Sequence, residues 1–387
     1  MSKERDLHPE TRLSRAGRDP KKQDGAVNPP VQRASTIVID DADNLYGDKT
    51  KTYALEGMAV HASLCEALIA VEGGAAATLA PSGLNACALA ILTVARAGGS
   101  LLVTDSVYGP TRRFCDKMLK RFGVTTRYFD PRIGGAIADL IDDTTCAIFL
   151  ESPGSLTFEI QDVPAIAAAA RARGVLAIID NTWAAGVYFK PFDHGVDLSV
   201  QALTKYQAGH ADTFAGAVLA ATPALGARVR MAYKELGLGL SPDDAYLALR
   251  GMRTMAVRMA RQAEVALEVA RWLETRDEVA RVLHPALPSH PDHALWKRDF
   301  TGAAGLFGAI LRPVSSAQLK AFLESLTLFS MGFSWGGYES LIIPCDPQIV
   351  RTAKAWSAEG PLLRLSIGLE HPRDLIADLD AGFALLR

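Results

Sequence analysis

The sequence predicts an α/β fold, in which helices cover both faces of a mostly parallel sheet and a smaller α+β part follows. Two observations lead to this prediction. Short apolar runs alternate with helical stretches from about residue 66 to 212, and the pattern changes character after one long predicted helix. Strands that alternate with helices form parallel sheets whose two faces are both buried.

The first part contains the clearest elements. Its predicted strands are short runs that end in an acidic residue, namely SLLVTD (100–105), CAIFLE (146–151) and VLAIID (175–180). Two of its predicted helices end at glycine pairs, and the third is rich in alanine: EALIAVEGG (66–74), NACALAILTVARAGG (85–99) and VPAIAAAARARG (163–174).

A long helix is predicted over residues 241–276, with Ser241 as its N-cap and Pro242 at its first position. Gly251 marks a place where this helix can break. The chain beyond it mixes strands with helices, which indicates an α+β domain. The strands are GLFGAILRP (305–313) and LLRLSIGLE (362–370), and the helices are AQLKAFLESL (317–326) and PRDLIADLDAGFALL (372–386).

Three parts follow from this pattern. Residues 1–57 lack periodicity and carry charges, prolines and glycines, so they are either disordered or an arm that contacts a neighbouring subunit. Residues 58–250 form the α/β domain, and residues 251–387 form the smaller C-terminal α+β domain. A length of 387 residues is too great for one ordinary core, which agrees with two domains.

Composition excludes several classes of protein. A net charge of −2 and a pI near 6.5 argue against nucleic acid or an anionic membrane as the main partner. The five cysteines are widely spaced, without a CxxC pair, and indicate free thiols in a reducing compartment. The polar N-terminus does not resemble a signal peptide, and the apolar runs fall short of a membrane span. We therefore expect a cytoplasmic protein.

Functional residues are expected just after the predicted strands, because ligands of open parallel sheets bind outside the carboxyl ends of the strands. The residues at these places are Ser82-Gly83, Tyr108, Ser155, Asp180 and Thr204-Lys205.

Each of these residues also has an ordinary structural explanation. Asp180 could cap a helix, Lys205 could be a surface lysine, and Tyr108 could belong to a turn beside Gly109-Pro110. Ser82-Gly83 is a common kind of helix start.

Together, however, the residues match the needs of pyridoxal phosphate. This cofactor requires a lysine for its covalent attachment and a carboxylate that keeps its ring nitrogen protonated. Its phosphate suits a helix N-terminus, and its ring needs an aromatic face. The histidines of HPALPSHPDH (284–293) lack the spacing of a metal site, so no metal is expected.

Several motifs in order along nearly the whole chain resemble the Cys/Met-metabolism family of pyridoxal-phosphate enzymes. They are VNPPVQRAST, ESPGSLTFEIQDVPAI, IIDNTWAAG, QALTKYQAGHAD, LALRGMRT, HPALPSHPDHALWKRDFTGAAGLF, FSWGGYESLI and LLRLSIGLEHPRDLIADL. The resemblance implies the aminotransferase-like type I fold, with residues 58–250 as the cofactor-binding domain.

The resemblance also implies residue roles. Lys205 would attach the cofactor and act as the catalytic base, Asp180 would contact its ring nitrogen, and Tyr108 would stack on its ring and take part in catalysis. The phosphate would be held by Gly83, Leu84 and Thr204, with Ser82, Tyr53 and Ser155 also at the cofactor.

Arg364 would bind the substrate α-carboxylate, although alone it could be a surface arginine at a strand edge. Ser334, Trp335 and Tyr338 would line the substrate pocket, with a core role as the alternative for Trp335.

Within the family, ESPGS, SWGGYESL and Ala202 resemble the β-lyase branch. This implies β-elimination of L-cystathionine, and of related S-substituted cysteines, to homocysteine, pyruvate and ammonia in sulfur amino-acid metabolism. Two alternatives stay open. One is a relative that acts at Cγ, either a γ-lyase or a γ-synthase, and the other is a non-catalytic cofactor-binding paralogue.

One position departs from the family pattern. The family's N-terminal arm carries Tyr-x-Arg, which reaches the phosphate in the neighbouring subunit of a homotetramer. Here Tyr53 matches the tyrosine, but Leu55 replaces the arginine. Lys49 or Lys51 are possible substitutes. Loss of the contact would cost about 1.5–3 kcal/mol of phosphate binding if nothing replaced it.

Overall fold

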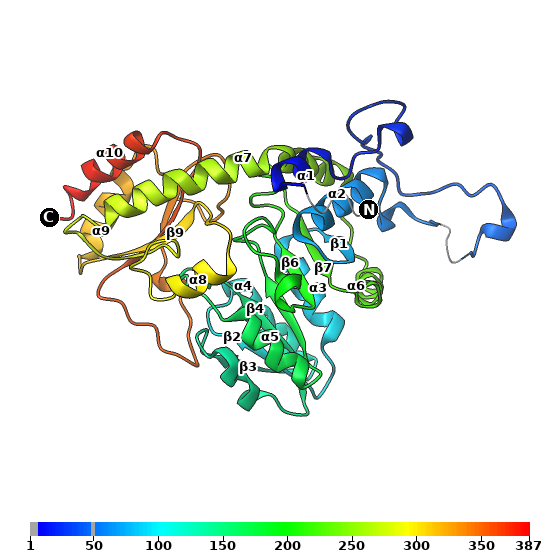
Figure 1. The fold of residues 1–387 in the computed structure, drawn as a ribbon, viewed down its shortest axis with the longest axis horizontal. Coiled ribbons are helices and arrows are strands. Elements are labelled where there is room, and N and C mark those ends of the chain that lie inside the picture. The colour runs from blue at the N-terminus through cyan, green and yellow to red at the C-terminus, as the bar shows by residue number, and fades with distance from the viewer. Residues whose placement is uncertain (1–6, 48–50) are drawn as a thin grey trace.

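The computed structural model describes residues 7–47 and 51–387, which form two sheets joined by one long helix (Figure 1). The larger sheet has seven strands in the order β1-β7-β6-β5-β4-β2-β3. Its strands are β1 (Ala76–Ala80), β2 (Ser100–Thr104), β3 (Thr125–Phe129), β4 (Thr145–Glu151), β5 (Leu176–Asp180), β6 (Leu198–Gln201) and β7 (Gly216–Ala220).

The larger sheet is mostly parallel, as the sequence predicts. Strands β3, β2, β4, β5 and β6 run parallel, and β7 is antiparallel to both of its neighbours, β6 and β1. Successive residues of β4 and β5 face opposite cores, because side chains of a strand alternate between the two faces. Ile148 and Ile179 join one core, whereas Phe149 and Ile178 join the other.

Helices cover both faces. α2 (Ala59–Glu72), α5 (Val163–Ala172) and α7 (Pro242–Leu273) contribute to one core, and α3 (Gly83–Val94) and α6 (Pro223–Glu235) to the other. The short α4 (Gly109–Arg113) follows β2, and a π-helical turn (Phe114–Leu119) continues it. The α/β architecture of the sequence prediction is therefore confirmed.

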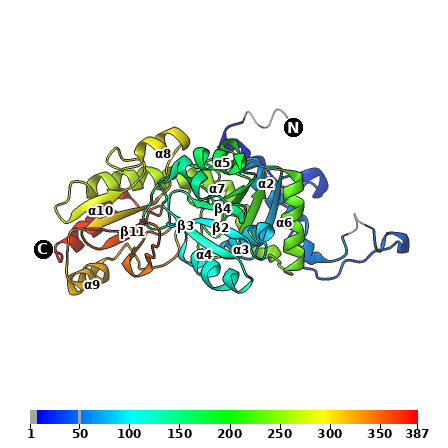
Figure 2. The same ribbon diagram turned by 90° about the horizontal axis from the view of Figure 1, so that it is seen from below.

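The second sheet is antiparallel, in the order β10-β11-β9-β8, and lies with its helices at the opposite end of the molecule from α6 (Figure 2). Its strands are β8 (Val279–Leu283), β9 (Leu306–Leu311), β10 (Leu341–Pro344) and β11 (Leu362–Ser366). The helices of this part are α8 (His293–Asp299), α9 (Ser316–Ser325) and α10 (Pro372–Phe383). A third core joins this sheet to α9, α10 and the end of α7.

Helix α7 runs without a break through Gly251, so the break expected there does not occur. Ser241 caps the helix, accepting a hydrogen bond from the backbone N–H of Asp243 at 3.2 Å. A β-carbon on Gly251 would lie 2.2 Å from the carbonyl oxygen of Ala208 and 2.3 Å from that of Gln207. The glycine is therefore explained by close approach of the helix to the chain that follows Lys205. The expected domain boundary at 250/251 falls inside this helix.

Part of the N-terminal segment packs on its own chain. α1 (Pro9–Arg15) lies against α2 and α7, with Leu13 buried, and the Arg253 guanidinium donates to the carbonyls of Leu13 and Ala16 at 2.8 and 2.7 Å. The following segment extends away from the body of the protein (Figure 1). Val38 and Tyr46 on this segment are 83% and 92% exposed, which is unusual for apolar side chains.

By length and composition alone, the continuous stretch Ala54–Glu72 is apolar enough to cross a membrane. It comprises a 3₁₀ turn (Ala54–Glu56) and α2, separated at Gly57, whose φ is 100°. The 14 residues of α2 span about 21 Å, less than the roughly 30 Å of a bilayer core. Its apolar residues Val60, Leu64 and Leu68 instead pack in the protein core.

The Gly251→Ala substitution tests the close approach of α7. In an open helix this change stabilises by roughly 1 kcal/mol. Here we expect the free energy of unfolding to fall by about 1–3 kcal/mol, since the new methyl group overlaps backbone oxygens. Denaturant unfolding measures the change. Val257→Ala, at an exposed position of the same helix, is the control and should change stability by about 0.5 kcal/mol or less. A stabilised Gly251→Ala variant would contradict the proposed contact.

Candidate active site

The carboxyl ends of β4, β5 and β6 open into a cavity of about 890 Å³. Both sheets contribute to its walls. Most of the site residues predicted from the sequence line it together: Ser82, Gly83, Leu84, Tyr108, Ser155, Asp180, Thr204, Lys205, Ser334, Trp335 and Arg364. Ser82 and Arg364, 282 positions apart in the chain, therefore meet in one place, because β11 and the 333–335 loop close the cavity from the second sheet.

Lys205 lies in the turn after β6, with its amine directed across the cavity. Its Nζ donates a hydrogen bond to Ser334 Oγ at 3.0 Å and lies 5.0 Å from the centre of the Trp335 ring. Burial, together with the nearby Arg364 guanidinium, lowers the pKa of Lys205 to about 8. A surface lysine would keep its ordinary pKa near 10.4, so this amine is poised to lose its proton near neutral pH.

Asp180 ends β5 and its carboxylate faces the same cavity. Oδ1 accepts hydrogen bonds from the backbone N–H and the hydroxyl of Thr182, at 3.0 and 2.5 Å, and Oδ2 accepts one from the Cys87 thiol at 3.6 Å. Burial raises the pKa of Asp180, although these donors oppose the shift. Asp180 does not cap a helix, so the alternative explanation for this residue does not apply.

The N-terminus of α3 opens into the cavity through Ser82, Gly83 and Leu84. Ser82 is the N-cap, and its hydroxyl accepts from the backbone N–H of Asn85 at 3.2 Å. A β-carbon on Gly83 would lie 2.5 Å from Cβ of Ala202, so only glycine lets the helix approach the chain beside Lys205 this closely. The free backbone N–H groups of such a helix start attract an anion.

Tyr108 and Ser155 are held by neighbouring loops. The backbone N–H of Tyr108 donates to Glu151 Oε2 at 2.6 Å, and that of Ser155 donates to the Ser106 carbonyl at 2.9 Å. Burial raises the pKa of Glu151 well above its usual value, and the neighbouring Asp180 adds to the shift. Tyr108 is 44% exposed and lines the cavity, where its ring is available to a stacking partner.

Arg364 reaches the cavity from β11 of the second sheet. One guanidinium nitrogen donates to the carbonyls of Gly332, Phe333 and Ser334, at 3.3, 2.8 and 3.0 Å. Its side chain is buried, and within residues 7–47 and 51–387 its Nε finds no hydrogen-bond partner. A buried guanidinium with an unused donor is suited to a carboxylate ligand. Its burial excludes the alternative explanation that Arg364 is a surface arginine at a strand edge.

Trp335 and Thr204 have contacts of their own. The Trp335 ring meets the buried Tyr206 ring edge-on, with centroids 5.5 Å apart, and also lines the cavity, so it serves both core and pocket. The Thr204 hydroxyl accepts from the backbone N–H of Ala215 at 3.1 Å and donates to the Ala215 carbonyl at 3.2 Å. This pairing fixes the turn that carries Lys205.

Two residues that the resemblance assigns to the site do not line this cavity. Tyr338 is 54% exposed, and its ring lies 6.5 Å from that of His210. Tyr53 is 50% exposed and forms a backbone bridge with Thr36. The expected contact of Tyr53 with a neighbouring subunit stays a prediction.

Leu55 stands at the position where the family pattern has an arginine that binds the phosphate. The Leu55 side chain packs against Gly239, and its carbonyl accepts from the Tyr233 hydroxyl at 3.2 Å. Lys51, one expected substitute, donates to the Gly57 carbonyl at 2.5 Å. Lys49, the other, lies outside the residues that the structure describes.

Among the site residues that sequence reasoning missed are three that contact predicted ones. Cys87 and Thr182 both donate to Asp180, and Glu151 holds the loop of Tyr108. Thr182 has a local signal, because Asp-x-Thr is a common turn in which the carboxylate accepts from the residue two positions later. Cys87 lies one helical turn after Gly83 and so shares its face, but nothing local distinguishes it.

These residues fit pyridoxal phosphate. The cavity offers an amine of lowered pKa on Lys205, a buried carboxyl on Asp180 and a helix N-terminus for the phosphate. Glycine at position 83 lets the start of α3 lie directly against Ala202, which brings the backbone N–H groups of this helix close to Lys205. Across the described ranges, no three His, Cys, Asp or Glu side chains are grouped to hold a metal ion.

Comparison with known proteins agrees with this geometry. Residues 10–384 match the family described as Cys/Met metabolism PLP-dependent enzyme. The cystathionine beta-lyases of Salmonella typhimurium and Escherichia coli are each 44% identical to this chain, over 97% of it and 98% of their own length. The cystathionine gamma synthase of Xanthomonas oryzae pv. oryzae, solved in complex with aminoacrylate and cysteine, superposes with a TM-score of 0.91 at 32% identity, with 98% of each chain covered. This chain belongs to the Cys/Met-metabolism family of pyridoxal-phosphate-dependent enzymes.

Proposed function

We propose that this chain is a carbon–sulfur lyase that cleaves the Cβ–S bond of L-cystathionine and of related S-substituted cysteines. The products are homocysteine, or the corresponding thiol, with pyruvate and ammonia. The observation that carries the proposal is the Lys205 amine, which has a lowered pKa and contacts Ser334 and Trp335 beside Arg364. Identity of 44% to two cystathionine beta-lyases, against 32% to a gamma synthase, favours reaction at Cβ.

Lys205 is the base in this reaction. A neutral amine next to Ser334 can remove the proton from the substrate Cα and then return a proton to the departing sulfur. When bound, pyridoxal phosphate supplies an electron sink for the negative charge that develops at Cα. A pKa of about 8 leaves roughly a tenth of the amine neutral at pH 7, far more than for a lysine with its ordinary pKa.

Two further residues orient the reactants. Arg364 binds the substrate α-carboxylate through the donor that is unused within the chain, which directs the Cα proton toward the lysine. With pyridoxal phosphate bound, Asp180 would keep the ring nitrogen protonated, and Thr182 and Cys87 hold its carboxylate in place. Ser334 and Trp335 belong to the substrate side of the pocket, and Tyr108 to the cofactor side.

With Leu55 in the place of an arginine, binding of the phosphate would depend more on groups of the chain that carries Lys205. The backbone at the start of α3 supplies donors, and Ser82, Thr204 and Ser155 border the same cavity. Lys51 would contribute only after leaving the Gly57 carbonyl. Binding through helix N–H groups needs no side-chain charge, because the aligned peptide dipoles favour an anion.

We further propose that the enzyme is a cytoplasmic homotetramer. The extended segment before α2, with exposed Val38, Tyr46 and Tyr53, supports a contact with a second subunit. All five cysteines are free thiols, which supports a reducing compartment.

A product assay tests the proposed function. With L-cystathionine and pyridoxal phosphate, we expect release of pyruvate and homocysteine, because elimination at Cβ leaves a three-carbon product. Release of 2-oxobutyrate and cysteine would instead indicate an enzyme that acts at Cγ. Cofactor binding without turnover of any thioether amino acid would indicate a non-catalytic paralogue.

Lys205→Ala should abolish pyruvate release, with a loss of at least about 10⁴-fold in kcat, since the same amine attaches the cofactor and moves the proton. The visible absorbance of the lysine-linked cofactor should disappear. A variant that still turned over at the wild-type rate would remove Lys205 from the reaction.

The lowered pKa of Lys205 predicts a pH dependence for cofactor uptake by the apoenzyme. Only the neutral amine attacks a carbonyl, so the rate of uptake should rise with pH and reach half its maximum near pH 8. In Arg364→Gln the midpoint should move to higher pH, because Arg364 is one cause of the lowered pKa. Stopped-flow absorbance measures the rate. Arg113→Gln, at the exposed rim of the same cavity, is the control and should leave the midpoint unchanged.

A further inference from the structure

One wall of the cavity comes from residues 346–354, which we call the wall segment. It leaves the second sheet after β10 and precedes β11, and its residues Pro347–Arg351 line the same cavity as Lys205 and Asp180. Its outer residues, Thr352, Ala353 and Lys354, are exposed to solvent. Only Asp346–Gln348 form a 3₁₀ turn, and the rest of the segment has no regular structure, so it needs specific contacts if it is to keep one shape.

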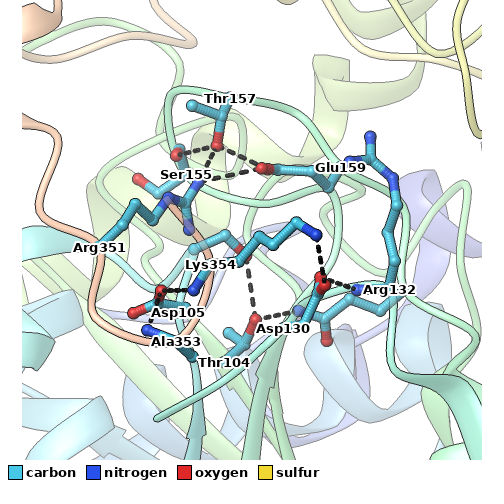
Figure 3. Close-up of polar contacts among 12 residues, drawn as sticks. Thr104, Asp105, Asp130, Arg132, Ser155, Thr157, Glu159, Arg351, Ala353 and Lys354 are labelled. Atoms are coloured by element: carbon cyan, nitrogen blue, oxygen red, sulfur yellow. Dashed lines mark hydrogen bonds and ion pairs between the residues drawn. The ribbon is translucent and has the colours of Figure 1, made fainter. Parts of the chain in front are cut away.

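Asp105 supplies one set of these contacts. It directly follows β2, three residues before Tyr108, and its side chain is fully buried. Its carboxylate accepts hydrogen bonds from the backbone N–H groups of Thr352, Ala353 and Lys354, at 2.9, 2.8 and 2.9 Å. Figure 3 shows Asp105 beside Ala353 and Lys354. The carboxylate also pairs with the buried Arg112 guanidinium. Burial by itself raises the pKa of Asp105, but these donors outweigh it and lower the pKa below its ordinary value.

Arg351 supplies the second set. Its guanidinium is 6% exposed and donates to Glu159 Oε1 at 3.1 Å and to the Thr157 hydroxyl (Figure 3). Thr157 in turn donates to Glu159 Oε2 at 2.5 Å, and its backbone N–H donates to the Ser155 carbonyl at 2.9 Å. The wall segment is therefore tied to two loops of the larger sheet, one leading to Tyr108 and one carrying Ser155.

These contacts differ from an ordinary link between the two parts of the chain. Arg132 and Asp292 also join the parts, through two hydrogen bonds of 2.7 and 2.8 Å, but neither residue lines the cavity. Asp105 and Arg351 both line the cavity and bind the segment that forms its wall. Buried charges are strongly destabilising when left unpaired, so loss of either contact would release the segment.

We propose that Asp105 and Arg351 are positioning residues that hold the wall segment against the cavity and so determine which S-substituents the enzyme accepts. The inference rests on the proposed lyase function and extends it to substrate selection. The apolar side chains of Pro347, Ile349 and Val350 then limit the room beside the reacting sulfur. Substrates with a large S-substituent depend on this wall, whereas a substrate with a methyl group does not reach it.

The test compares Asp105→Asn with the wild-type holoenzyme. An asparagine amide directs N–H groups at backbone N–H groups, so part of the clamp is lost. We expect KM for L-cystathionine to rise roughly tenfold with kcat changed less than about threefold, as for a lost contact that binds substrate and transition state alike. The kinetic constants for S-methyl-L-cysteine and the cofactor absorbance should stay unchanged. Arg132→Gln is the matched control and should alter neither substrate.

Hydrogen exchange of a peptide covering residues 346–354 gives a readout independent of turnover. Exchange should increase in Asp105→Asn and stay at the wild-type level in Arg132→Gln. Unchanged exchange would overturn the clamp even if the enzyme proved to act on another substrate. Failure of the wild type to release pyruvate would refute the lyase function and leave this exchange test in force.

A second variant tests the same proposal in case Asp105→Asn does not fold. The double change Arg351→Met with Glu159→Gln removes the ion pair without leaving a buried charge alone. It should show the same selective rise in KM for L-cystathionine and faster exchange of residues 346–354. If both variants fold and bind cofactor, but affect the two substrates equally, the wall segment does not set specificity and the proposal is wrong.

Discussion

The site depends on one physical constraint, namely that an amine is kept in a buried place where its charged form is disfavoured. Lys205 belongs to the larger sheet, but Arg364 and Ser334, which surround its amine, belong to the second part of the chain. Burial and the Arg364 guanidinium both lower the pKa of Lys205, so packing of the second part against the larger sheet contributes to it. The unbroken α7 contributes to this packing, because it runs beside the turn after Lys205 and continues into the core of the second sheet.

A second electrostatic feature lies on the cofactor side. Glu151 and Asp180 are directly opposite each other in the register of β4 and β5, and burial raises the pKa of both. Two neighbouring carboxyl groups in a buried site resist losing both protons. A cationic ring nitrogen placed against Asp180 would stabilise its carboxylate and leave Glu151 to hold the loop of Tyr108. The pair therefore suits a ligand that brings a positive charge to β5.

Much of this arrangement was predictable from the sequence, for reasons that are local. Asp180 and Lys205 follow short apolar strands, and strand ends of a parallel sheet meet at one edge. Arg364 and Ser334 carry no such signal and depended on the resemblance. Asp105 and Arg351 were not recognised as site residues, because their partners lie about 250 and 190 positions away in the chain.

Two features of the fold were also not predicted. Helix α1 was missed because Leu13 is its one buried residue, so the segment shows no apolar periodicity. Gly251 suggested a break in the long helix, but the glycine is explained by the close approach of α7 to the backbone of Ala208.

The two sides of the cavity are supported in different ways, and this difference bears on function. Behind Asp180 and Lys205, the buried Glu72 carboxyl accepts hydrogen bonds from Asn181, Ser199 and Gln201, which tie α2 to the ends of β5 and β6. Such a fully buried polar network keeps its members in one arrangement, because any unpaired member would be costly. On the substrate side, the outer residues of the wall segment are exposed to solvent, and the buried side chains of Asp105 and Arg351 hold the segment through charged contacts. Cofactor geometry therefore follows from the core of the larger sheet, while the shape offered to the substrate depends on a few charged contacts. Substitutions near the wall segment can change substrate choice without disturbing the atoms that hold the cofactor.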